Sequence, residues 1–129
     1  MEQSFILLAD HATVHPEDRT LTVVRSGISE IAGQPPVTFG GYVVAWHRSS
    51  EESIQEAVAF EVRGHADNVI QKIEYPLEAK IPAMATRCYV AKLAITFAQL
   101  GGHRVVLLVR GVEKAFMDFN VKARNEAKQ

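Results

Sequence analysis

Histidine has the most versatile chemistry of the residues in this chain, because it changes charge near neutral pH and can act as an acid, a base or a metal ligand. The chain contains five histidines: His11, His15, His47, His65 and His103. His11 and His15 are four residues apart, a spacing that on a helix places both rings on one face, as a metal site requires. Thr13 is β-branched and Pro16 follows closely, so we expect an extended segment, in which the two rings stand roughly 13 Å apart. That separation is too large for one ion. We therefore predict hydrogen-bonded or solvated histidines there, and no metal or cofactor.

Trp46, His47 and Arg48 form a second group with a chemical use, an aromatic and cationic cluster of the kind that anchors binding interfaces. The same tryptophan also continues an apolar alternation with Tyr42 and Val44, which predicts that it points inward and packs in the core. Both interpretations stay open from the sequence. No catalytic residue is predicted, and the candidate binding residues are Trp46, His47, Arg48, His11 and His15.

Motifs specific to enzymes are missing from the sequence, including the G-x-S-x-G, H-E-x-x-H, paired C-x-x-C and P-loop patterns. Gly101, Gly102 and His103 resemble a phosphate-binding loop only in part, because a strand-like run follows them where such a loop requires a helix. The single Cys88 excludes an internal disulfide, and its strand-like surroundings predict that it is buried. The sequence thus gives no positive evidence for an enzyme.

Charge and composition place the chain among ordinary globular domains. It has 129 residues, of which 47% are hydrophobic, and 14 basic residues against 15 acidic ones give a net charge of -1. Because the charges are nearly balanced, the chain has no electric field that would attract nucleic acid or an anionic membrane. The apolar run from Phe5 to Ala9 is too short for a signal peptide or a membrane span, and a single cysteine suits a reducing compartment. We expect a cytoplasmic protein with one domain over residues 1–123 and a polar tail over residues 124–129.

Apolar and polar residues alternate at every second position through most of the chain, which predicts β-strands. About eight strands are expected: Phe5 to Ala9, Thr20 to Arg25, Val37 to His47, Val58 to Arg63, Val69 to Lys80, Tyr89 to Phe97, Val105 to Val109 and Ala115 to Val121. Ser49 and Glu52 match a capping box, so one short helix is expected over Ser50 to Glu56. This pattern predicts an all-β fold, an antiparallel β-sandwich of the immunoglobulin-like or C2-like type, with a closed barrel as the second choice.

Glycines and prolines predict how these strands are connected. The first two strands are expected to form a hairpin, and the last three a meander. Gly40 and Gly41 indicate a bulge or a bend inside the third strand. Pro76 and Pro82 interrupt the segment that begins at Val69, which should therefore lie at a sheet edge.

The two ends of the chain resemble an uncharacterised family of small bacterial β-sandwich domains, a domain of unknown function. The features that carry the resemblance are an opening strand closed by an aspartate (Phe5 to Asp10), a strand over Thr20 to Gly27, and a terminal hairpin from Gly102 to Val121. His103 departs from the pattern, because such domains often carry a tyrosine there. The resemblance implies a β-sandwich, and it implies no catalytic residue, cofactor or substrate.

Two functions from different classes fit these patterns. The first is a non-catalytic interaction module that binds a protein partner or forms a homo-oligomer, because a sandwich presents loops and strand edges to partners. The alternative is a small enzyme or a ligand- or metal-binding domain whose histidines gather at one end of the sandwich. A third interpretation, a subunit of a larger assembly, requires an exposed apolar patch, and Val69 to Met84 is the segment expected to form it.

Overall fold

The computed structural model describes residues 2–15, 21–49, 57–75, 84 and 86–124 of the chain. The predicted helical turn over Ser50 to Glu56 and the tail beyond residue 124 lie outside these residues. The described part contains a short 3-10 turn at His65–Asp67. It also contains nine strands: β1 (Glu2–Val14), β2 (Leu21–Ser26), β3 (Glu30–Gly33), β4 (Val37–Ser49), β5 (Val58–Arg63), β6 (Val69–Glu74), β7 (Thr86–Phe97), β8 (Gly101–Val109) and β9 (Val112–Ala123).

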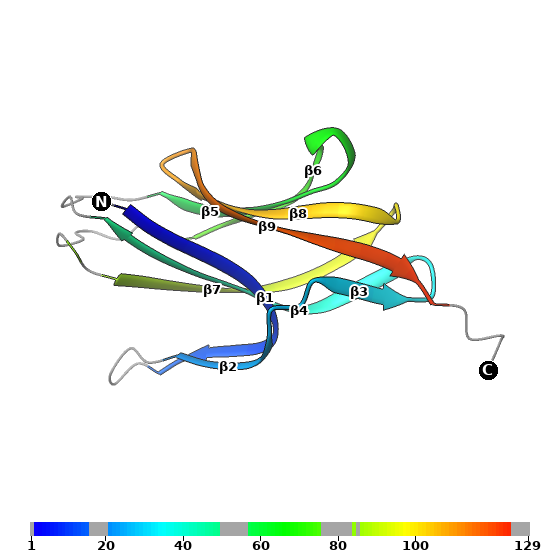
Figure 1. Ribbon diagram of the computed structural model, residues 1–129, viewed down its shortest axis with the longest axis horizontal. Coiled ribbons are helices and arrows are strands. Elements are labelled where there is room, and N and C mark those ends of the chain that lie inside the picture. The colour runs from blue at the N-terminus through cyan, green and yellow to red at the C-terminus, as the bar shows by residue number, and fades with distance from the viewer. Residues whose placement is uncertain (1, 16–20, 50–56, 76–83, 85, 125–129) are drawn as a thin grey trace.

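The strands form two sheets that pack face to face (Figure 1). One sheet has four strands in the order β2-β1-β4-β7, and the other has five in the order β3-β9-β8-β5-β6. Neighbouring strands are antiparallel except β3 and β9, which run parallel. The chain is therefore an all-β sandwich, as the alternation of its residues predicted.

The core between the sheets follows the period of two that the sequence shows. Along β5, buried residues alternate with half-buried ones, and β7 buries every second residue from Tyr89 to Phe97. The largest side chains in this core, all at most 2% exposed, are Tyr89, Phe60, Phe97, Leu8, Leu93 and Leu107. Removing this apolar surface from water is the main stabilising contribution to such a fold.

The last three strands do not form the predicted three-stranded meander. β7 pairs with β4 in the four-stranded sheet, whereas β8 and β9 form a hairpin in the five-stranded sheet. Residues 98–100 therefore carry the chain from one sheet to the other. Alternation shows which side chains share a face of a strand, but it does not show which sheet the strand joins. The sequence also gave no sign of β3, because four residues are too few to reveal a period.

Gly40 and Gly41 do not form the predicted bulge, because β4 keeps one register with β7 from Val37 to Arg48. Gly41 permits a close approach instead. A Cβ at Gly41 would lie 2.5 Å from Cζ of Phe39 and 2.6 Å from the carbonyl oxygen of Ala9. Ala9 is the last residue of β1 that pairs with β4, and the rest of β1 pairs with β2 in the expected hairpin. The glycine is thus needed where β1 leaves its neighbour.

Tyr75 connects the two sheets at one side of the sandwich. It follows β6, the edge strand of the five-stranded sheet, as predicted for the segment that begins at Val69. Its hydroxyl donates to the carbonyl oxygen of Val90 at 2.6 Å and accepts the N–H of Val90 at 2.9 Å. Val90 lies on β7, the edge strand of the other sheet. The phenol therefore occupies a place where a further strand would pair with β7.

Candidate functional site

The three consecutive candidates Trp46, His47 and Arg48 lie on β4, where alternation divides them between its two faces. His47 points inward, is 2% exposed, and shares a hydrogen bond between its Nδ1 and Oγ of Ser4 at 2.8 Å. This bond gives a buried polar ring a partner, as a core position requires. Trp46 and Arg48 lie on the opposite face. A pocket of about 200 Å³ touches all three, and its other lining residues are Gln3, Ser4, Phe5 and Thr86.

The alternation with Tyr42 and Val44 predicted that Trp46 points into the core between the sheets, and this prediction is wrong. Val43 and Ala45 take that place, and Tyr42, Val44 and Trp46 form a separate cluster on the other side of the sheet. β4 lies between β1 and β7 and carries apolar residues on both faces. Its sequence therefore does not show which of the two sets is the inward one.

The separate cluster covers the outer surface of the four-stranded sheet. We call it the aromatic face, and it consists of Phe5, Leu7, Tyr42, Val44, Trp46 and Val90. Val44 is fully buried among its neighbours, while Phe5 is 56% exposed and its ring centroid lies 5.5 Å from that of Trp46. Cys88 lies on β7 opposite Trp46. It is half-buried, whereas the sequence predicted that it is buried. Ala12 and Val23 of the β1–β2 hairpin, which bends back beneath the four-stranded sheet (Figure 1), pack in the same cluster and cover part of this face, whereas the end with Phe5 stays exposed.

Two cationic side chains lie on the aromatic face beside the apolar residues. Arg48 follows Trp46 on the same side of β4, and its Nε donates to the carbonyl oxygen of Met84 at 3.1 Å. Lys92 is exposed on β7 opposite Tyr42. Neither forms an ion pair with a described residue. The apolar centre is therefore accompanied by positive charge.

His11 and His15 lie near the end of β1 and do not form a metal site with each other. The segment is extended, as Thr13 and Pro16 predicted. Nε2 of His11 is 2.9 Å from Oγ1 of Thr13, and Nε2 of His15 is 2.6 Å from Oγ1 of Thr22. The ring of His11 also meets Tyr42 edge-on, with 5.2 Å between the centroids. His11 thus borders the aromatic face, and His15 lies beyond it along the hairpin.

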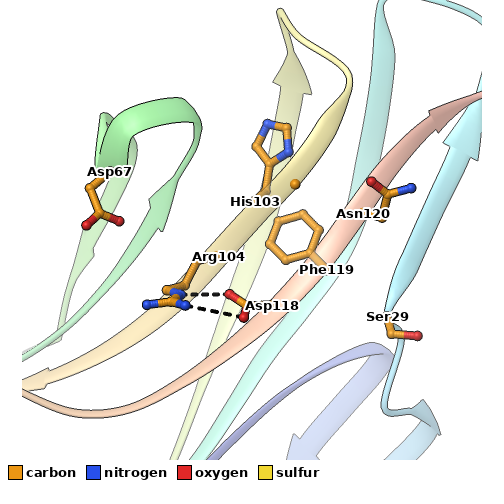
Figure 2. A pocket seen from close by; sticks show the side chains of 8 residues that line it. Ser29, Asp67, His103, Arg104, Asp118, Phe119 and Asn120 are labelled. Atoms are coloured by element: carbon orange, nitrogen blue, oxygen red, sulfur yellow. Dashed lines mark hydrogen bonds and ion pairs between the residues drawn. The ribbon is translucent and has the colours of Figure 1, made fainter.

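A polar pocket of about 670 Å³ was not predicted from the sequence (Figure 2). Its lining residues are Ser29, Asp67, Gly102, His103, Arg104, Asp118, Phe119 and Asn120. Arg104 donates to both carboxylate oxygens of Asp118, from Nε at 2.7 Å and from Nη2 at 3.3 Å (Figure 2). The hydrogen bond from Arg104 lowers the pKa of Asp118, and the carboxylate in turn raises the pKa of Arg104. The two charges neutralise each other, and only the register of β8 with β9 brings them together.

His103 forms part of the wall of this pocket and is 5% exposed. Its Nδ1 donates to the carbonyl oxygen of Gly101 at 2.9 Å, and its ring stacks on Phe119 with 5.6 Å between the centroids. The ring of His65 lies 6.1 Å away, and its Nε2 donates to the carbonyl oxygen of Leu100 at 3.1 Å. Two of the five histidines are therefore neighbours, and each donates to a backbone carbonyl. Within the described ranges, no three histidine, cysteine or carboxylate side chains gather to hold a metal ion.

No helix in the described part of the chain is long and apolar enough to cross a bilayer.

Comparison with known proteins gives only weak similarity to solved structures. No family model and no curated protein matches the chain. A CARDB domain from Pyrococcus furiosus, solved in complex with di-metal ions, has a TM-score of 0.48 and 11% identity, over 96% of this chain and 94% of that domain. A β-glucosidase from Listeria innocua has a TM-score of 0.48 and 10% identity over 95% of this chain. An alkylpurine DNA glycosylase from Pseudomonas fluorescens, bound to DNA containing an abasic site analog, has a TM-score of 0.49 and 12% identity over 92% of this chain.

This chain spans 16% of the β-glucosidase and 30% of the DNA glycosylase. At such identities and TM-scores, neither the activities of these proteins nor their ligands bear on this chain. The resemblance of the two chain ends to small bacterial sandwich domains is likewise structural only.

Proposed function

We propose that this chain is a non-catalytic β-sandwich module that binds a protein partner through the aromatic face. The observation that carries the proposal is an apolar surface that includes Trp46 and Phe5, where the β1–β2 hairpin covers one part and Phe5 remains 56% exposed. Contiguous exposed apolar surface on a folded domain marks a contact site. Tryptophan, tyrosine and arginine, which this face combines, contribute most to binding energy at protein interfaces.

The charges on the face indicate what kind of partner fits. Arg48 and Lys92 accompany the apolar centre, and neither has a carboxylate partner among the described residues. The single described carboxylate at the start of the β1–β2 hairpin, Asp10, is paired with Arg25 at 3.1 Å. A partner with an apolar contact patch and carboxylates around it complements this arrangement, and complementary charge increases both specificity and the rate of association.

The polar pocket supports the alternative function less well. Arg104 and Asp118 are bound to each other, and the ring of His103 is packed on Phe119 with its Nδ1 proton donated to a carbonyl group. A general acid or base must reach its substrate, and the His103 ring is only 5% exposed. The proposal therefore rests on the aromatic face, and it places the module in the cytoplasm, for which the single Cys88 is the support.

The proposal is tested by comparing two truncations on opposite sheets. Trp46→Ala removes the centre of the aromatic face, and Ile70→Ala, on β6 of the other sheet at 40% exposure, is the matched control. Each tagged chain is used to isolate partners from its own cells, and a purified partner is then titrated by calorimetry. We expect about tenfold weaker binding or more for Trp46→Ala and no change for Ile70→Ala.

Circular dichroism and thermal unfolding of both variants establish that they are folded. The proposal fails if the wild-type chain retains no partner, or if both variants bind the partner as the wild type does. A concentration-dependent dimer that Trp46→Ala disrupts, in light scattering, would assign the same face to self-association instead.

A further inference from the structure

A groove runs along one flank of the sandwich, where β1 of one sheet faces β9 of the other. Its volume is about 590 Å³. One side is lined by Ser4, Phe5, Ile6 and Leu7, and the other by residues 113–117, with Gly27 at one end. The first half of β1 and the whole of β9 run in the same direction along this flank (Figure 1). Phe5 and Leu7 also belong to the aromatic face, so the groove and that face are continuous.

Backbone groups of β1 are open toward this groove. The carbonyl oxygen of Leu8 accepts the N–H groups of Gly27 and Ile28, at 2.9 and 3.2 Å, and therefore points away from β4. In an antiparallel pair, every second residue has its N–H and C=O on the outer side. Ile6 and Ser4 share the orientation of Leu8, and β2 pairs with β1 only from Ala9 onward. Among the described residues, no backbone group pairs with Ile6 or Ser4 on that side.

β9 has the same property on the other side of the groove. The N–H of Asn120 donates to the carbonyl oxygen of Ser29 at 2.9 Å and thus points away from β8. By the same alternation, Asp118 and Phe116 direct their N–H and C=O away from β8. β3 pairs with β9 only from Asn120 to Ala123. The described residues therefore leave backbone groups open on both sides of the groove.

Other edges of the two sheets carry features that discourage strand pairing. On β7, the hydroxyl of Tyr75 binds both backbone groups of Val90. β6 carries Lys72 and Glu74, and β3 is four residues long. Natural proteins protect edge strands by charged residues, short length and covering side chains. The run from Gln3 to Leu8 has none of these: it contains neither a charge nor a proline, and Phe5 is exposed.

We propose that the β1–β9 groove receives an extended segment of the protein partner as an added strand antiparallel to β1, a mode of binding in which main-chain hydrogen bonds provide affinity. This inference rests on the proposed function. The concave shape selects one extended segment over a second copy of the chain, because two identical grooves facing each other leave both unfilled. Glu113 is already bound to Arg63 at 3.2 Å, and the remaining walls include Phe5, Leu7 and Met117. Lys114 also lines the groove, so the segment has apolar residues at alternate positions and no excess of positive charge.

The test separates the backbone of Ser4 from its side chain. Ser4→Pro and Ser4→Ala both remove the hydroxyl that is bound to His47, but only Ser4→Pro removes the outward N–H. Twelve-residue peptides are selected from a random library on the wild-type chain, synthesised, and titrated against both variants. We expect selected peptides with alternating apolar residues, and binding about tenfold weaker or more for Ser4→Pro than for Ser4→Ala. Amide exchange at Ser4 and Ile6 should slow when peptide binds.

A second measurement uses the wild-type chain alone, in case Ser4→Pro does not fold. Methylating the peptide nitrogens at the set of alternate positions that faces β1 should abolish binding, and methylating the other set, which faces β9, should weaken it less. The inference is overturned if selection enriches no peptides, if both methylated sets bind equally, or if Ser4 and Ile6 exchange unchanged. A native partner that requires Trp46 but binds Ser4→Pro as it binds Ser4→Ala would leave the proposed function standing and remove the groove from it.

Discussion

Val44 and Val106 occupy corresponding places on the outer surfaces of the two sheets, and they are buried in different ways. Each lies on a strand with neighbours on both sides, and each is 0% exposed. Val44 packs in one cluster with Tyr42 and Trp46 of the aromatic face and with Ala12 and Val23 of the β1–β2 hairpin. Val106 lies in register between Glu61 and Phe116, on the sheet whose outer surface carries most of the described ion pairs.

The outer surface of the five-stranded sheet satisfies its own charges. Arg63 contacts Glu61 at 2.8 Å and Glu113 at 3.2 Å, and the guanidinium of Arg104 lies 3.9 Å from the ring centroid of Phe116. Arginine covers apolar surface with its aliphatic stem while its head stays solvated. That sheet therefore needs no partner to shield Val106. The four-stranded sheet shields Val44 with apolar side chains, including Ala12 and Val23 of the β1–β2 hairpin, and leaves Phe5 of the aromatic face 56% exposed. The difference indicates which surface is suited to contact another protein.

The largest expected effect on stability comes from adding a methyl group to either side of β4. It tests whether the outer side of the strand has space for that group at Gly40. Gly41→Ala places a Cβ within 2.6 Å of both Phe39 and the backbone oxygen of Ala9, whereas Gly40→Ala meets no atom within 4 Å. We expect Gly41→Ala to lower the free energy of unfolding by about 2–3 kcal/mol. Gly40→Ala should be neutral or slightly stabilising, because a strand gains when glycine is replaced. Urea unfolding measures both, and a Gly40→Ala variant as unstable as Gly41→Ala would contradict an open outer surface.

The next effect concerns the charged cover of Val106. Arg63→Met retains the apolar stem but leaves Glu61, whose side chain is 13% exposed, without its cation. A poorly exposed carboxylate that loses its partner costs about 1–2 kcal/mol of unfolding free energy. Glu113→Gln, which removes only the more exposed carboxylate at 39%, should cost much less. If thermal unfolding shows equal stability for wild type and Arg63→Met, these ion pairs do not stabilise the surface and the comparison with the aromatic face weakens.

The difference between the two outer surfaces was only partly predictable from the sequence. On β5 and β7, one face is clearly more apolar than the other, so alternation gave the correct inward set. On β4, both faces are apolar, and the inward set was assigned to Tyr42, Val44 and Trp46, which is wrong. The direction of such a strand is decided by which sheet its neighbours join. That depends on contacts distant in sequence, such as Phe5 with Trp46.

The residues of the candidate sites also differ in how far the sequence predicts them. The sequence indicates Trp46 and Arg48 because an aromatic and a cationic side chain together suit an interface, and both lie on one face, whereas His47 between them is in the core. Arg104 with Asp118, and Ser4 with Ile6, carry no local signal. The first pair is created by cross-strand register and the second by the point at which β2 begins to pair with β1.

A smaller effect is expected at the protected edge of the four-stranded sheet, and it sharpens the contrast between this edge and the open one at β1. Tyr75→Phe keeps the ring between Phe60 and Tyr89 but removes the hydroxyl that binds both backbone groups of Val90. We expect a loss of about 1 kcal/mol in unfolding free energy, since two partly buried polar groups lose one partner. Amide exchange at Val90 should become faster. Unchanged exchange there would mean that the phenol does not protect β7.

The smallest effect comes from pH and distinguishes a charged surface from an apolar one. Arg104 holds the pKa of Asp118 below its ordinary value, so the carboxylate contributes stability above the pKa it has in the unfolded chain. That contribution is lost as pH falls through the lower pKa of the folded state. It is small, because the Asp118 side chain is 63% exposed and solvent screens the pair. In a carbon-detected NMR titration, Arg104→Gln should raise the pKa of Asp118 toward the ordinary value. Trp46→Ala should leave the pKa of Asp118 unchanged, because the aromatic face lies on the other sheet. If Asp118 of the wild type has its ordinary pKa, Arg104 does not neutralise its charge.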